Sequence, residues 1–72
     1  MIKNPYNILN VKENASLKEI KENYKKIAIQ YHPDKQKTGI EKEIATQKFI
    51  DANIAYNLLI DETQRNKYDN LS

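Results

Sequence analysis

Two apolar stripes with helical spacing, separated by a proline, limit what this chain can fold into. In the first segment, ASLKEIKENYKKIAIQY, the apolar residues recur at steps of three and four: Leu17, Ile20, Tyr24, Ile27 and Tyr31. The second stripe has the same spacing and comprises Ala45, Phe49, Ala52, Tyr56 and Leu59. Such steps place side chains on one face of an α-helix, so each segment predicts an amphipathic helix. Neither stripe can be buried alone and the connection is short, so we expect the two helices to pack antiparallel.

A shorter helix should precede the first stripe. Asn4 followed by Pro5 is typical of a helix start, because Asn favours the N-cap and Pro the first helical position. Asn10 tolerates the left-handed backbone conformation and should end this helix. Its inward residues would be Tyr6 and Leu9.

Capping signals and the proline indicate where the other helices begin and end. Ser16 with Glu19 three residues later forms a capping box. The residue before Pro33 is disfavoured in the helical conformation, so the helix that starts at Ser16 should end at Tyr31 or His32. Asp61 with Gln64 three residues later suggests the cap of a last, short helix. The expected helices span approximately residues 5–10, 16–31, 41–60 and 62–70.

No segment alternates between apolar and polar residues, so we expect no strand. The predicted fold class is all-α, with four helices. The long antiparallel second and third helices form a hairpin with the His-Pro-Asp loop at its tip, and the fourth helix should turn Tyr68 and Leu71 inward. A chain of 72 residues is enough for one small domain, residues 1–72, with a thin core.

Composition excludes several kinds of protein. The chain has no cysteine and one histidine, so we expect no disulfide, no metal site and no bound cofactor. No apolar stretch approaches the ~20 residues of a membrane span, and the N-terminus lacks the apolar core of a signal peptide. We therefore expect a cytoplasmic protein without membrane contact. The abrupt end at Leu71-Ser72 suggests the front part of a longer protein.

The triplet His32, Pro33 and Asp34 directly follows the first stripe and allows four interpretations. It could be a plain helix stop. A metal site would need three or four converging ligands, and acid–base catalysis by His32 would need a pocket and a partner group. In the fourth interpretation, Pro33 stiffens a turn from which Asp34 projects a carboxylate that can accept a bidentate arginine. We favour this recognition turn, because a turn that is ordered beforehand loses less entropy on binding.

Lysines gather on the second helix and just after the triplet: Lys18, Lys21, Lys25, Lys26 and Lys35. On a helical wheel the first three lie to one side of the apolar stripe, and Lys26 lies nearly opposite it. A solvated helix face with ordinary intrahelical ion pairs would explain these lysines as well. Their position beside a stiff acidic turn favours a docking face for an acidic partner.

The segment YKKIAIQYHPDK resembles the signature of the J-domain, the module of DnaJ-type co-chaperones. NPYNILNV is similar to the family's opening helix, with Asn10 where a glycine is usual. KFIDANIAYNLLID resembles the third helix and RNKYDNL the fourth, so the resemblance covers nearly the whole chain. It implies four helices, with the triplet at the tip of the antiparallel second and third.

The resemblance also implies a function. The chain would be a co-chaperone module, not an enzyme, that binds the ATP-loaded form of a DnaK-type 70-kDa heat-shock chaperone and stimulates its ATP hydrolysis. His32, Pro33 and Asp34 would form the activating loop. The other positions that match the family's docking residues are Tyr24, Lys25, Lys26 and Lys35, with Lys21 and Lys18 as weaker candidates. We expect a monomer that binds no nucleic acid.

Two other functions fit the same residues. A small helical nucleic-acid-binding domain would use the basic second helix. Against it, the net charge is only +2 and Arg65 is the sole arginine, the usual reader of guanine. A structural hairpin that tethers a larger assembly would affect no ATPase.

Five isoleucines outside the two stripes have no assigned role: Ile29, which lies among the lysines of the second helix, and Ile40, Ile44, Ile50 and Ile54. They are either scattered exposed apolar residues or fill the groove beneath the short helices. Alternatively, Ile50 and Ile54, which are four residues apart, form part of a binding patch.

Overall fold

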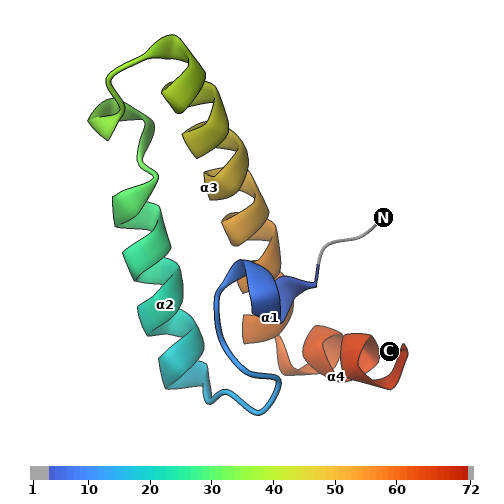
Figure 1. Cartoon of the computed structure of the whole chain (residues 1–72). Helices are drawn as coiled ribbons and strands as arrows, with labels where there is room; N and C mark the ends of the chain where they lie inside the picture. Colours follow the sequence, from blue (N-terminus) through green and yellow to red (C-terminus); the bar gives the residue numbers. More distant parts are fainter. Residues whose placement is uncertain (1–3, 72) are drawn as a thin grey trace.

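The computed structural model describes residues 4–71, and over that range it contains helices and no strand. Its elements, in chain order, are α1 (Pro5–Ile8), α2 (Leu17–Gln30), a 3-10 helix (Pro33–Lys35), α3 (Gly39–Ile60) and α4 (Glu62–Leu71). Figure 1 shows α2 and α3 side by side, joined at one end by the loop that carries the 3-10 helix. The all-α prediction with an antiparallel hairpin is confirmed. Of the predicted domain, residues 1–3 and 72 lie outside the described residues.

Two tyrosines hold the middle of the hairpin together. The rings of Tyr24 on α2 and Tyr56 on α3 are stacked, with centroids 4.2 Å apart and an interplanar angle of 14°. The Tyr24 hydroxyl donates a hydrogen bond to Asn53 Oδ1 on α3. A tyrosine packed between two helices needs a partner for its hydroxyl, and this bond provides one while fixing how α2 and α3 are aligned.

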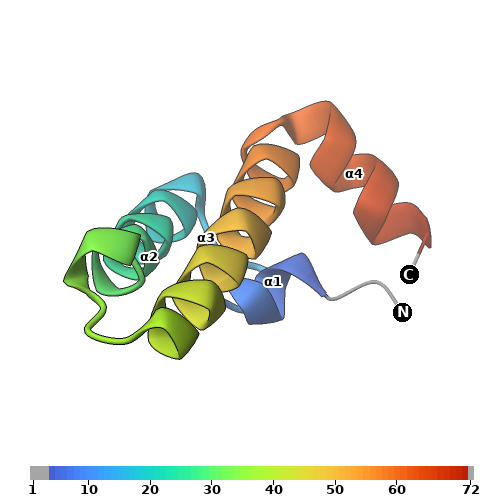
Figure 2. The same cartoon turned by 90° about the horizontal axis from the view of Figure 1, so that it is seen from above.

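The core lies at the base of the hairpin, where α1 packs against α3. Figure 2 shows α1 on one side of the hairpin. The buried residues in this cluster are Tyr6, Leu9, Ala15, Ile20, Ala52, Ala55 and Leu59. The alanines of α3 let α1 approach closely. The predicted inward positions of Tyr6 and Leu9 are confirmed.

Leu17 and Leu71, both predicted to face inward, are exposed instead. Leu17 is the first residue of α2, and helical side chains lean toward the N-terminus, so its side chain lies beyond the packed surface. The fourth helix reaches the core through Tyr68, whose ring centroid is 6.1 Å from that of Tyr6. Leu71 lies nearly one turn further along α4, past this contact.

The caps explain most helix bounds. Asn4 Oδ1 accepts hydrogen bonds from the amides of residues 6 and 7, and Ser16 Oγ accepts one from the Glu19 amide. The first helix is shorter than predicted, ending at Ile8, and Asn10 takes the expected left-handed conformation with φ 56°. Asp61 Oδ1 accepts from two amides at the start of α4, as its predicted cap requires.

The third helix begins at Gly39, two residues before the predicted start at Glu41. Thr38 is the N-cap, and its hydroxyl accepts a hydrogen bond from the Glu41 amide. The Glu41 carboxylate in turn accepts one from the Lys37 amide. Thr38 and Glu41 thus have the spacing of a capping box, a signal that was present in the sequence and overlooked.

A polar clamp ties α4 to α1 and to the loop before α2. The Tyr6 hydroxyl donates to Asp69 Oδ1 at 2.6 Å and accepts from Arg65 Nε at 3.1 Å. Arg65 Nη2 also donates to the main-chain oxygens of Glu13 and Ala15, at 3.0 and 2.8 Å. Burial, followed by the hydrogen bond to Asp69, raises the pKa of Tyr6, because both favour the neutral hydroxyl over the charged phenolate.

Replacing Arg65 by lysine should destabilise the domain by about 1–3 kcal/mol, because an ammonium cannot reproduce the fixed fork of donors that spans Tyr6 and two carbonyls. Urea unfolding followed by circular dichroism measures this change. The exposed Lys67 on the same helix offers the reverse exchange as a control. Lys67→Arg should change the free energy of unfolding by less than about 0.5 kcal/mol. Equal effects of the two exchanges would contradict the clamp.

Candidate functional site

The His-Pro-Asp triplet forms a hydrogen-bonded turn at the tip of the hairpin. His32 has extended backbone angles, which ends α2, and Pro33 opens the 3-10 helix. The Lys35 amide donates to the His32 carbonyl at 3.0 Å, and the Gln36 amide donates to the Pro33 carbonyl at 3.2 Å. The Asp34 amide donates to His32 Nδ1 at 3.3 Å. The histidine therefore acts as the cap of the turn that presents Asp34.

Gln36 also holds this turn, and sequence reasoning missed it. Its side-chain Nε2 is 3.3 Å from both the Gln30 and the His32 carbonyl oxygens, donating a hydrogen bond to each. The side chain thus bridges the end of α2 and the start of the 3-10 helix. Neither periodicity nor a capping pattern marks this position, because the bond depends on how the loop folds back.

The Asp34 carboxylate points into solvent. Its side chain is 91% exposed, and its Oδ2 lies 3.8 Å from His32 Nδ1. Over residues 4–71 no group of the chain donates a hydrogen bond to this carboxylate, so both oxygens are open to a visiting donor. A carboxylate with two accessible oxygens can accept a bidentate arginine.

Phe49 connects the tip to α3. Its ring meets the His32 ring edge to face, with centroids 6.2 Å apart and an interplanar angle of 84°. Phe49 was expected in the buried stripe but is only half-buried and lies outside the core cluster. The reason is its position toward the tip, where the hairpin is not covered by α1 or α4. Its packing against His32 stabilises the loop rather than the core.

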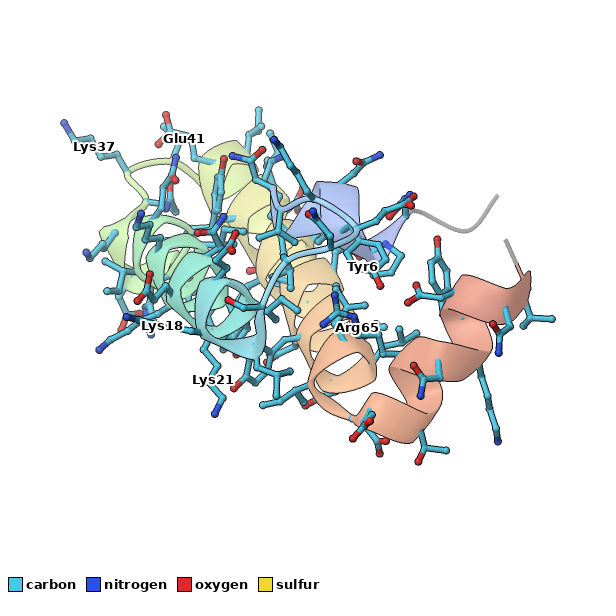
Figure 3. All side chains as sticks on the ribbon, turned by 90° about the horizontal axis from the view of Figure 1, so that it is seen from below. Tyr6, Lys18, Lys21, Lys37, Glu41 and Arg65 are labelled. Atoms are coloured by element: carbon cyan, nitrogen blue, oxygen red, sulfur yellow. The ribbon has the colours of Figure 1, made fainter. Side chains whose placement is uncertain are left out.

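The five predicted docking lysines, including the weaker candidate Lys18, are exposed: Lys18, Lys21, Lys25, Lys26 and Lys35. Figure 3 shows Lys18 and Lys21 projecting from α2 on the side of the hairpin opposite α1. Asn23 explains this orientation. Its side-chain amide donates to the Leu9 and Asn10 carbonyls, which keeps the end of α1 on the other side of α2.

Tyr24, also a predicted docking residue, is half-buried within the hairpin. Its ring and hydroxyl are both used in contacts with α3. Of the predicted site residues, the structure therefore places the lysines and Asp34 in solvent, and Tyr24 in the packing between α2 and α3. A docking role of Tyr24 stays a prediction.

A groove of about 550 Å³ lies between α1 and the hairpin, with Tyr31 and Lys48 among its lining residues. The Lys48 ammonium lies 5.3 Å from the centre of the Tyr31 ring. His32 does not line this groove and is half exposed, which does not suit general acid–base chemistry in an enclosed site. Over residues 4–71, no three acidic or histidine side chains are grouped as metal ligands would be. Within the same range no helix has the length and apolar character to span a bilayer.

Comparison with known proteins identifies the family. The model of the DnaJ domain matches residues 4–69, which is nearly the whole chain. The chain belongs to the DnaJ domain family. DnaJ domains are co-chaperone modules and not a class of enzyme.

Relatives of this DnaJ domain are much longer proteins. It is 44% identical over 68 residues to "Chaperone protein DnaJ 2" of Synechocystis sp., covering 94% of this chain and 21% of the relative. It is 46% identical over 67 residues to "DnaJ homolog subfamily C member 3 homolog" of Dictyostelium discoideum, covering 93% of this chain and 13% of the relative. The chain thus spans about a fifth or less of these two proteins.

Solved structures show the same fold. The solution structure of the J-domain of a mouse DnaJ-like protein superposes with a TM-score of 0.87 at 34% sequence identity, covering 97% of this chain and 78% of that one. The crystal structure of ERdj5 form II gives a TM-score of 0.81 at 39% identity, covering 96% of this chain and 9% of that one. The four-helix prediction from the J-domain resemblance is therefore confirmed.

Proposed function

We propose that this DnaJ domain binds the ATP-bound state of a DnaK-type 70-kDa chaperone and stimulates its ATP hydrolysis. Membership of the family supports the co-chaperone role, since relatives carry the name "Chaperone protein DnaJ". The observation that carries the residue assignment is the 91% exposure of Asp34 at the end of a hydrogen-bonded turn. A carboxylate folded inward onto its own chain would not be able to meet a partner.

In the proposed mechanism, Asp34 competes for an arginine that helps to hold the chaperone's domains and linker in their ATP-bound arrangement. Losing that contact shifts the chaperone toward an arrangement in which its own catalytic groups act on ATP. Such a population shift requires that Asp34 binds one state better than the other. His32, Pro33 and Gln36 contribute by keeping the carboxylate in place before the chaperone arrives.

The proposed function is tested by a single-turnover ATPase assay against several purified DnaK-type chaperones. The domain should accelerate hydrolysis by at least one of them, with a rate that saturates as the domain concentration rises. Failure to accelerate hydrolysis by any chaperone of a broad panel would contradict the proposal.

The monomeric state and the cytoplasmic location remain predictions from the sequence.

The lysines should mainly increase the rate of association with an acidic surface of the chaperone. The double variant Lys21→Ala/Lys25→Ala should slow association on the order of ten-fold at low salt and flatten its dependence on salt. Stopped-flow binding at several salt concentrations measures both. The matched control is Lys12→Ala/Lys67→Ala, which removes the same charge from exposed lysines in the loop before α2 and in α4. Equal slowing by both pairs would mean that only net charge matters.

The structure does not favour the nucleic-acid alternative. Arg65, the sole arginine, is half-buried and bonded to Tyr6 and two main-chain carbonyls. It is therefore not presented to a base edge. Retention on heparin or duplex DNA at moderate salt separates the two functions, because a nucleic-acid binder should be held tightly and released steeply by salt.

A further inference from the structure

Two isoleucines on α3 are exposed and lie close to each other. Ile50 is 45% and Ile54 is 62% exposed, and their spacing of four residues places them on one face of the helix. Single exposed apolar residues are common on protein surfaces and need no explanation. The position of this pair relative to the proposed docking residues is what gives it significance.

The hydrogen bond between Tyr24 and Asn53 locates the pair. On α2, Lys21 lies three residues before Tyr24 and Lys25 lies one residue after it, so the two lysines flank the bond on that helix. On α3, Ile50 likewise lies three residues before Asn53, and Ile54 lies one residue after it.

The lysine pair and the isoleucine pair therefore border the same side of the hairpin, which we call the bridge face. Figure 3 shows Lys21 on the side away from α1, so the bridge face is not covered by that helix. One contact links the His-Pro-Asp turn to the α3 part of this face. Phe49, the residue before Ile50, contacts the His32 ring. The bridge face therefore leads along α3 toward the turn.

The two kinds of residue on the bridge face have complementary energetic effects. Exposed charges speed and orient an encounter but contribute little net free energy once water and salt screen them. Apolar side chains add affinity in proportion to the area that the partner removes from water. A surface with lysines alone would bind fast and release fast.

We propose that Ile50 and Ile54 are an apolar contact of the same DnaK-type chaperone that the lysines approach, seated on an apolar surface beside its acidic one. This inference rests on the proposed function and extends it from α2 to α3. It assigns affinity and residence time to the isoleucines, and activation to Asp34.

The test compares two matched pairs of isoleucines on α3. Ile50→Gln/Ile54→Gln removes the proposed contact, and Ile40→Gln/Ile44→Gln removes an equally spaced pair that is 72% and 51% exposed. Because an α-helix turns by about 100° per residue, the control pair points about 80° away from Ile50 and Ile54 around the helix axis. Glutamine has a helix propensity at least as good as isoleucine, so both variants should keep the fold, which circular dichroism verifies.

Binding of the ATP-loaded chaperone is measured by fluorescence anisotropy, and hydrolysis by single turnover at saturating domain. Ile50→Gln/Ile54→Gln should raise Kd on the order of ten-fold through faster dissociation. The salt dependence of association and the saturated hydrolysis rate should not change. The control pair should stay within about two-fold of the unmutated chain, a difference of about 0.4 kcal/mol.

Each of the following results would overturn the inference. Equal affinities of the two variants would show that the bridge-face pair has no special role. A dimer of the unmutated chain in sedimentation velocity that Ile50→Gln/Ile54→Gln dissociates would assign the surface to a second copy. Absence of binding to any DnaK-type chaperone would remove both this inference and the proposed function. Normal stimulation with no difference between the pairs would remove this inference alone.

Discussion

Asp34→Asn should reduce stimulated ATP hydrolysis to the chaperone's basal rate. Asparagine has the same shape, but it carries no charge and offers one acceptor oxygen instead of two, so it cannot form a bidentate pair with arginine. Because the side chain is 91% exposed, the free energy of unfolding should change by less than about 0.5 kcal/mol. Single-turnover hydrolysis and urea unfolding of the same preparation measure the two effects separately.

Glu62→Gln is the control for this variant. It also turns an exposed carboxylate into an amide, but in the first turn of α4, at the other end of the hairpin from the His-Pro-Asp turn. It should stimulate hydrolysis as well as the unmutated chain. If Asp34→Asn also stimulated at the unmutated level, the assignment of the activating residue would be wrong, whatever the chain's affinity for the chaperone.

Leu59→Ala should have the largest effect on stability, about 2–5 kcal/mol. The side chain is fully buried at the base of the hairpin, among the residues that join α1 to α3. Small domains have a total stability of about 5–15 kcal/mol, so this loss would leave a large unfolded fraction at moderate temperature. Thermal and urea unfolding measure the loss.

Leu71→Ala makes the same chemical change at a residue that is 88% exposed. It should alter the free energy of unfolding by less than about 0.5 kcal/mol. The comparison distinguishes burial from the general effect of shortening a leucine. A similar loss in both variants would mean that α4 packs differently at its end.

The features that could be predicted from the sequence depend on residues close together in the chain. Helical spacing of the two stripes predicted α2 and α3, and Asn4, Ser16 and Asp61 marked helix starts by bonding to amides two or three residues away. The left-handed Asn10 and the turn at Pro33 follow from the backbone preferences of single residues. The missed start of α3 was of the same kind, since Thr38 and Glu41 are three residues apart.

The contacts between residues distant in sequence were decided only by the tertiary structure. Arg65 meets Ala15 across 50 positions and Tyr6 meets Asp69 across 63, and no local pattern pairs them. Periodicity gave Leu17, Phe49 and Leu71 the same weight as Leu59, although the first and third are exposed and Phe49 is half-buried. A stripe defines which face of a helix is apolar, but burial depends on which parts of that face another helix covers. That coverage exists only once the helices have packed, so the sequence by itself determined the helices and the turn, and packing decided the core, the clamp and the bridge face.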